Sequence, residues 1–142
     1  MKLSKFLLLA VSLLTTSIAT SAELNVSAIY RDHMDADGFA NTFSEDGTLV
    51  VRSGSYHGRQ EIRKNITDRA QPATAHMIMF TTTQITPLSA TEASGISSAL
   101  VLNGDRPVKA GDKPVQMLGI TAANEYRSKF ILTDEGWKIS HL

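Results

Sequence analysis

The sequence predicts an α+β fold, a cone-shaped barrel in which a strongly curved, mostly antiparallel sheet wraps around three N-terminal helices. Before Pro72, apolar residues recur mainly at helical spacing, whereas beyond it a period of two dominates, which marks the passage from helices to strands. Helices followed by a long meander of strands are typical of the α+β class. A sheet bent in this way leaves an apolar cavity inside the cone, and we expect that cavity to be the ligand site.

The first 22 residues have the composition of a secretory signal peptide. Lys2 and Lys5 precede an apolar run over residues 6–14, and small uncharged residues follow as far as Ala22. The run is well short of the roughly 20 apolar residues that cross a bilayer, so we expect no membrane span after signal removal. We therefore expect cleavage after Ala22, a single domain over residues 23–142, and a periplasmic or secreted location.

The composition excludes several kinds of function. The 142 residues are 42% hydrophobic and 20% charged, with 14 basic side chains against 14 acidic ones, as in one ordinary globular domain. A neutral chain has no basic field to collect phosphates, so we expect no nucleic-acid partner. The chain has no cysteine, which rules out disulfides, thiol nucleophiles and thiolate metal sites. No pair of histidines has the spacing of a local metal site either, so we expect no metal and no cofactor.

Three helices are predicted in the first half of the chain. The first spans residues 26–37, and its apolar stripe follows the i, i+3, i+4, i+7, i+8 spacing: Val26, Ile29, Tyr30, His33 and Met34. Asp37 is placed to cap a second, short helix, on which Phe39 and Phe43 stack four residues apart. The third helix runs from Arg59 to Ala70 and is stopped by Pro72.

The strands begin after a predicted turn at residues 45–47. Residues 48–51 are β-branched enough for a strand, and a loop rich in Ser and Gly then runs to Gly58. Period-two segments follow at residues 74–86, 93–102, 117–132 and 137–142. In the first of these, His76, Ile78 and Phe80 share one face, and Met77 and Met79 lie on the other.

Four landmarks resemble the SnoaL-like domain proteins, in the superfamily of nuclear transport factor two, ketosteroid isomerase and scytalone dehydratase. They are the run 30–47, Gly58-Arg-Gln-Glu-Ile62, His76 at the start of a strand, and Asp134-Glu-Gly136-Trp137-Lys-Ile139. The likeness covers nearly the whole chain after the signal, and its specificity is in the order and spacing of the landmarks. It implies the same cone-shaped barrel. It does not fix a reaction, because this fold hosts isomerases, dehydratases, cyclases, hydrolases and proteins without catalysis.

The resemblance also implies a catalytic pair. In its dehydratase-like branch, an Asp in the turn after the first helix works with a His at the start of the first long strand, and those positions are Asp35 and His76 here. A neutral imidazole can remove a proton beside a carbonyl while a carboxylate orients the ring. Tyr30 matches the aromatic residue before that Asp, and its hydroxyl could donate to a developing oxyanion. Tyr30, Ile78 and Phe80 are therefore expected to bind substrate.

Each of these residues also has a purely structural interpretation. Asp35 could cap a helix, His76 could be a core histidine with satisfied hydrogen bonds, and Tyr30 could be a core aromatic. The function that we predict is an exported protein that binds a small, mostly apolar molecule, acting as a cofactor-independent dehydratase or isomerase. Two alternatives stay open: a non-catalytic carrier or sensor of a lipophilic ligand, and an interaction module that pairs as a homodimer through the convex sheet face.

Overall fold

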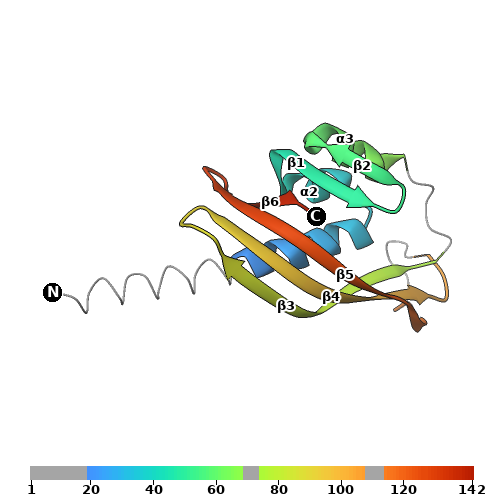
Figure 1. Cartoon of the computed structure of the whole chain (residues 1–142). Helices are drawn as coiled ribbons and strands as arrows, with labels where there is room; N and C mark the ends of the chain where they lie inside the picture. The colour runs from blue at the N-terminus through green and yellow to red at the C-terminus, as the bar shows by residue number, and fades with distance from the viewer. Residues whose placement is uncertain (1–18, 69–73, 108–113) are drawn as a thin grey trace.

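The computed structural model describes residues 19–68, 74–107 and 114–142, and it confirms the predicted α+β class. Helical backbone at residues 19–32 is followed by α2 (Ala36–Asn41), β1 (Phe43–Val51), β2 (Gly54–His57) and α3 (Gly58–Thr67). Four strands complete the fold: β3 (His76–Pro87), β4 (Glu92–Gly104), β5 (Met117–Thr133) and β6 (Gly136–His141). Figure 1 shows the long strands β3, β4 and β5 side by side, with α2, α3, β1 and β2 grouped beyond β5, on the side away from β4.

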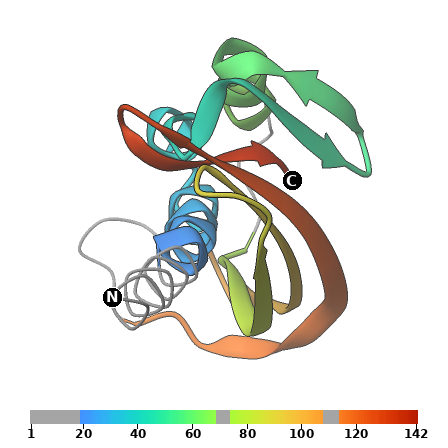
Figure 2. The same cartoon turned by 60° about the vertical axis from the view of Figure 1, so that its left-hand side comes forward.

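The six strands form one sheet in the order β2-β1-β6-β5-β4-β3. All neighbouring pairs are antiparallel except β1 and β6, which run parallel. The sheet is an open cone, because its edge strands β2 and β3 do not pair with each other. Figure 2 shows the sheet curving around the N-terminal helix, so that the helix covers its concave side.

Aromatic and branched side chains fill the space between this sheet and the helices. Phe39 on α2, Phe43 on β1 and Phe130 on β5 are each at most 1% exposed, and the rings of Phe39 and Phe43 meet edge to face at 5.3 Å. Gly95 makes room for Phe130, since a Cβ there would lie 3.2 Å from the Phe130 ring. The core therefore joins α2 to the middle of the sheet.

The buried face of the N-terminal helix differs from the predicted stripe. Leu24, Ser27 and Ala28 are buried, whereas Val26 and Ile29 are 38% and 56% exposed. Small side chains at 27 and 28 allow the helix to approach the sheet closely, and this packing outweighs the larger apolar residues on the neighbouring face. The apolar stripe that was predicted to face the core is therefore displaced around the helix axis from the face that is buried.

The same helix ends earlier than residue 37, at a Schellman motif. The Asp35 amide donates to the Tyr30 carbonyl over 2.8 Å and the Met34 amide to the Arg31 carbonyl over 3.1 Å. Met34 has the left-handed φ of 57° that this motif requires at its turning residue. Glycine usually occupies that position, so with a methionine there the sequence lacks the usual signal for the end of a helix.

Asp35 caps α2, a place that the sequence assigned to Asp37. The Asp35 carboxylate accepts the Gly38 amide over 2.8 Å, and its backbone is extended, as an N-cap requires. Asp37 instead lies in the first turn of α2 and pairs with Arg63 of α3. That guanidinium holds the pKa of the Asp37 carboxyl below its ordinary value.

We expect the substitution Asp35→Ala to lower the free energy of unfolding by about 1 kcal/mol, because the first turn of α2 loses its side-chain acceptor. Asp35→Asn keeps an acceptor and is expected to retain most of that stability. Urea denaturation of the two variants and the wild type measures the difference. Equal losses in both variants would show that the charge, and not the cap, carries the effect.

Two further local predictions need correction. The predicted turn at residues 45–47 lies inside β1, where the register with β6 shifts between Phe43 and Thr48 and a Cβ on Gly47 would come within 3.0 Å of the Ile139 carbonyl. The predicted loop before Gly58 contains β2, which pairs with β1 as a hairpin. The third helix and the four later strands lie close to the predicted ranges, although Ala70 and Pro72 fall outside the described residues.

Candidate functional site

The structure has a cavity of about 900 Å³ at the mouth of the cone. Its walls come from the end of the N-terminal helix (residues 31–34), the β2 hairpin (53–56), one face of α3 (61–68) and His76 at the start of β3. Carbon atoms form most of the accessible area of the wall, although most of the residues that line it have polar or charged side chains. The cavity is therefore suited to a molecule with an apolar body and a small number of polar groups.

Asp32 and His76 form a hydrogen-bonded pair in this wall. Asp32 Oδ1 lies 3.1 Å from His76 Nδ1, and the side chains are 11% and 31% exposed. The second carboxylate oxygen, Oδ2, accepts the backbone amide of Ile78 over 2.8 Å. Both oxygens of Asp32 are thus held by β3, and the carboxylate is fixed relative to the imidazole.

The sheet topology explains why Asp32 finds these partners. β3 is an edge strand, so part of its backbone N–H groups face away from β4 and need another acceptor. Asp32 is in the last turn of the N-terminal helix, which lies against the concave side of the sheet, and it supplies that acceptor to Ile78. The motif that ends the helix immediately after Asp32 lets the chain turn away toward α2.

This arrangement selects one tautomer of His76. An ionised carboxylate can only accept hydrogen bonds, so the proton of a neutral imidazole is on Nδ1, and Nε2 carries the free lone pair. His76 lines the cavity. The pair has the parts of a general base, namely a nitrogen that can take a proton and a buried carboxylate that orients the ring and stabilises its charged form.

Asp35, the predicted partner of His76, is used elsewhere. Its carboxylate accepts from Gly38 at the start of α2, whereas the carboxylate that meets His76 belongs to Asp32. The physical reason is the helix end, which places residues 33 and 34 in a turn and puts Asp35 at the head of the next helix. His76 itself is in the predicted place, at the beginning of β3.

The three predicted substrate-binding residues lie outside the wall of the large cavity, as far as the described residues show. Tyr30 packs over Gly38, where an added Cβ would come within 2.4 Å of the ring, and it joins the core around Phe39. Ile78 and Phe80 line a much smaller void of about 10 Å³, beside Ala28 and Tyr126. The position of Tyr30 corresponds to its structural interpretation as a core aromatic, and Ile78 and Phe80 belong to a second core cluster with Ala28.

The sequence pattern missed Asp32, although one signal was present. Leu24, Ala28 and Asp32 follow each other at four-residue spacing, so they lie along one helix face, and the first two are buried. A carboxylate at the end of a buried stripe is expensive unless it has partners, which makes it a candidate site residue. The larger apolar residues of the neighbouring stripe obscured this pattern.

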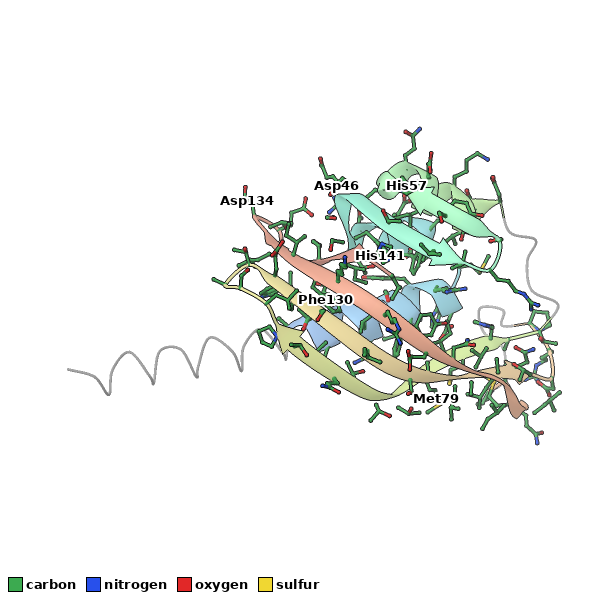
Figure 3. The ribbon with its side chains drawn as sticks, in the orientation of Figure 1. Asp46, His57, Met79, Phe130, Asp134 and His141 are labelled. Carbon is green, nitrogen blue, oxygen red and sulfur yellow. The ribbon has the colours of Figure 1, made fainter. Side chains whose placement is uncertain are left out.

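Among the described residues, no group of three or more His, Asp or Glu side chains is placed to hold a metal ion. His57 and His141, which Figure 3 labels, belong to different elements, at the β2–α3 junction and on β6. His57 meets Thr48 through Nδ1 over 3.2 Å.

No helix within the described ranges is long and apolar enough to span a membrane.

Comparison of structures finds the same fold in several solved proteins at low sequence identity. An NTF2-like protein with a cystatin-like fold from Novosphingobium aromaticivorans is 20% identical, with a TM-score of 0.76 over 95% of this chain and 84% of that one. A putative scytalone dehydratase from the same organism is 19% identical, with a TM-score of 0.73 over 93% and 84%. A type 2 hexachlorocyclohexane dehydrochlorinase, LinA, is 16% identical, with a TM-score of 0.73 over 93% and 85%.

The search of curated proteins gave no match. The family profile of the SnoaL-like domain, in contrast, matches residues 25–142, which is most of the chain and contains both Asp32 and His76. This match, together with the fold, shows that the chain belongs to the SnoaL-like family.

Proposed function

We propose that this protein is a cofactor-independent lyase or isomerase that removes a proton from carbon, with His76 as the general base and Asp32 as the residue that orients it. The observation that carries the proposal is the pair itself, with Nδ1 and Oδ1 3.1 Å apart at the wall of a cavity of about 900 Å³. His76 Nε2 is left with a free lone pair beside the space where a substrate would lie.

In the elimination, Nε2 removes the proton from the carbon next to a carbonyl. The electrons of that C–H bond form the new C=C bond, and the leaving group on the next carbon departs with its own bonding pair. The imidazolium is stabilised by the Asp32 carboxylate and returns the proton to the leaving hydroxide, which gives water. In an isomerisation, the same proton is returned to a different carbon.

The names of two similar structures agree with an elimination. A dehydratase removes water and a dehydrochlorinase removes hydrogen chloride, and both proteins have this fold. At 16% to 19% identity the likeness supports the class of reaction only as a proposal. The carbon-rich wall of the cavity supports a substrate with an apolar body.

The substitution Asp32→Asn tests the proposal. We expect it to lower kcat for dehydration of 3-hydroxy-5-phenylcyclohexanone by about 10²- to 10⁴-fold, because an amide cannot stabilise the imidazolium and can present a donor to Nδ1. The conjugated enone product is followed by its ultraviolet absorbance. Asp35→Asn is the matched control, and its kcat is expected to stay within about twofold because that residue caps α2.

Loss of activity in Asp35→Asn with full activity in Asp32→Asn would overturn the assignment and restore the pair expected from the family resemblance. Absence of turnover in the wild type, combined with a ligand that leaves the native protein unchanged in mass spectrometry, would favour the carrier or sensor function instead.

We also propose that the protein forms a homodimer through the convex face of the sheet. Met77, Leu102 and Ile120 are paired across β3, β4 and β5, so they share one face, and Met77 and Ile120 are 39% and 61% exposed. Met79, labelled in Figure 3, is 48% exposed on the same strand and face. Sedimentation of the wild type and of Met79→Glu tests this, with dimer and monomer as the expected results.

Export stays a proposal that rests on the residues before Glu23. The described helix passes through the expected cleavage point, and Leu24 is the first buried apolar residue after it. Cleavage after Ala22 would remove the buried Thr20 and leave Leu24 and the later buried residues of the helix in place. N-terminal sequencing of protein secreted by its host is expected to start at Glu23, and a start at Met1 would contradict a cleaved signal.

A further inference from the structure

Asn65 is a buried amide on the cavity wall with a hydrogen-bonding capacity that the fold does not use. It is 9% exposed, lies on α3 between the core residues Ile62 and Ile66, and contributes to the wall of the large cavity. Its Oδ1 is enclosed and has no hydrogen-bond partner among the described residues. A buried acceptor without a partner lowers stability relative to one that is paired.

Five neighbouring residues of the wall have hydrogen-bond or ion-pair partners. On α3, Glu61 accepts the His57 amide over 2.8 Å, and Lys64 pairs with Asp68. On the β2 hairpin, the hydroxyls of Ser53 and Tyr56 lie 3.2 Å apart. The Oδ1 atom of Asn65 therefore differs from the polar groups of these five neighbours, which are paired within the protein.

Stability alone does not explain an asparagine at this position. Leucine has the same branching at Cγ, a better helix propensity, and no polar atoms to leave unpaired between Ile62 and Ile66. Side chains that lower stability and have no structural role are typical of sites that bind a ligand. Asn65 faces the same cavity as His76, so a bound substrate is placed to satisfy it.

We infer that Asn65 is a specificity-determining residue that accepts a hydrogen bond from a hydroxyl on the substrate, at a site separate from the reacting carbon. Asn65 Oδ1 is enclosed, and it reaches the cavity by rotation about the terminal torsion of the side chain, which varies over a broad range in asparagine. An uncharged hydroxyl fits better than an ionic group, because Lys64 and Asp68 already neutralise each other beside it. This inference rests on the proposed function, since it names the substrate class of the same site.

The substrate class is thus a neutral β-hydroxy ketone whose apolar body carries at least one additional hydroxyl. The carbon-rich wall accommodates the body, and His76 acts at the carbon next to the carbonyl. A site built around a buried acceptor discriminates against the analogue that lacks the donor, because the acceptor then stays unpaired in the complex.

Two kinds of probe and two variants test this. The probes are 3-hydroxy-5-phenylcyclohexanone and its counterparts with a hydroxyl on the phenyl ring, meta or para. For the wild type, we expect kcat/KM for the better hydroxylated probe to exceed that for the phenyl probe by about 10-fold, the value of one good hydrogen bond. In Asn65→Leu, we expect this ratio to fall to about one, mostly through KM, while Tm stays equal or rises.

Ser97→Ala is the matched control. Ser97 is fully buried and its Oγ also has no partner among the described residues, but Ser97 does not contribute to the cavity wall. Its removal is expected to leave the probe ratio unchanged. A loss of Tm in Asn65→Leu, or the same ratio in this variant as in the wild type, would overturn the inference.

Titration calorimetry with the same probes separates this inference from the proposed function. A wild type that binds the hydroxylated probe more tightly than the phenyl probe, without turning over either one, supports the role of Asn65 and contradicts the role of His76. A wild type that turns over both probes at equal kcat/KM supports His76 and contradicts Asn65. A wild type that binds neither probe contradicts the role of Asn65 as well.

Discussion

Replacing His76 by alanine is expected to lower kcat for the β-hydroxy ketone by about 10²- to 10⁴-fold, the usual contribution of a general base. The imidazole is the base of the proposed pair, and its Nδ1 lies 3.1 Å from Asp32 Oδ1. The measurement is the rate of enone formation at saturating substrate, made beside a thermal melt that shows whether the variant is folded.

Two further variants show whether such a loss comes from the lost base. His76→Asn can still place an amide near Asp32 but has no Nε2, so it is expected to melt near the wild type and to be as inactive as the alanine variant. Met77→Ala changes the next residue of β3, whose side chain lies on the opposite face, and it is expected to keep wild-type kcat. Imidazole added to His76→Ala is expected to restore part of the rate. Unchanged turnover in both His76 variants would exclude the proposed base.

The largest effect on stability is expected from Phe130→Ala, which should lower the free energy of unfolding by about 3–5 kcal/mol. Phe130 is 1% exposed at the centre of the sheet, and its ring packs where Gly95 leaves room. A domain of this size has only about 5–15 kcal/mol in total, so the variant is expected to unfold at much lower urea concentration.

Leu132→Ala is the control for this substitution. Leu132 lies two residues further along β5 and is 41% exposed, so its loss is expected to cost less than about 1 kcal/mol. Urea denaturation followed by the fluorescence of Trp137, on the neighbouring strand β6, measures both variants. Equal midpoints for the two variants would show that the core does not depend on the Phe130 ring.

The strands could be predicted because their residues obey a local rule. The alternation around Ile78, with Met77 and Met79 on the other face, follows from the pleat of any strand that has one buried side. β2 escaped prediction because its residues Gly54–His57 have no alternation of apolar and polar side chains, and only the pairing with β1 defines it.

The site could be predicted only in part, because tertiary packing determines the surroundings of the Asp32 carboxylate and of the Asn65 amide. His76 was found through its place at the head of a strand. Asp32 was not, because the helix end depends on a left-handed methionine, and the buried helix face has the small residues Ser27 and Ala28 next to Leu24. Nothing local distinguishes Asn65 from a solvated asparagine on α3, since its burial comes from the sheet and hairpin around it.

The parallel pairing of β1 with β6 also has a consequence for how the chain folds. Ile139 and Leu142 donate their amides to the carbonyls of Thr42 and Thr48, so the centre of the sheet joins segments from opposite halves of the sequence. The β3–β4–β5 meander pairs strands that follow each other in the sequence. The pairing of β1 with β6, in contrast, requires the long chain segment between these two strands to close into a loop. That entropy cost places the protein among domains of high contact order, which fold in milliseconds to seconds rather than microseconds.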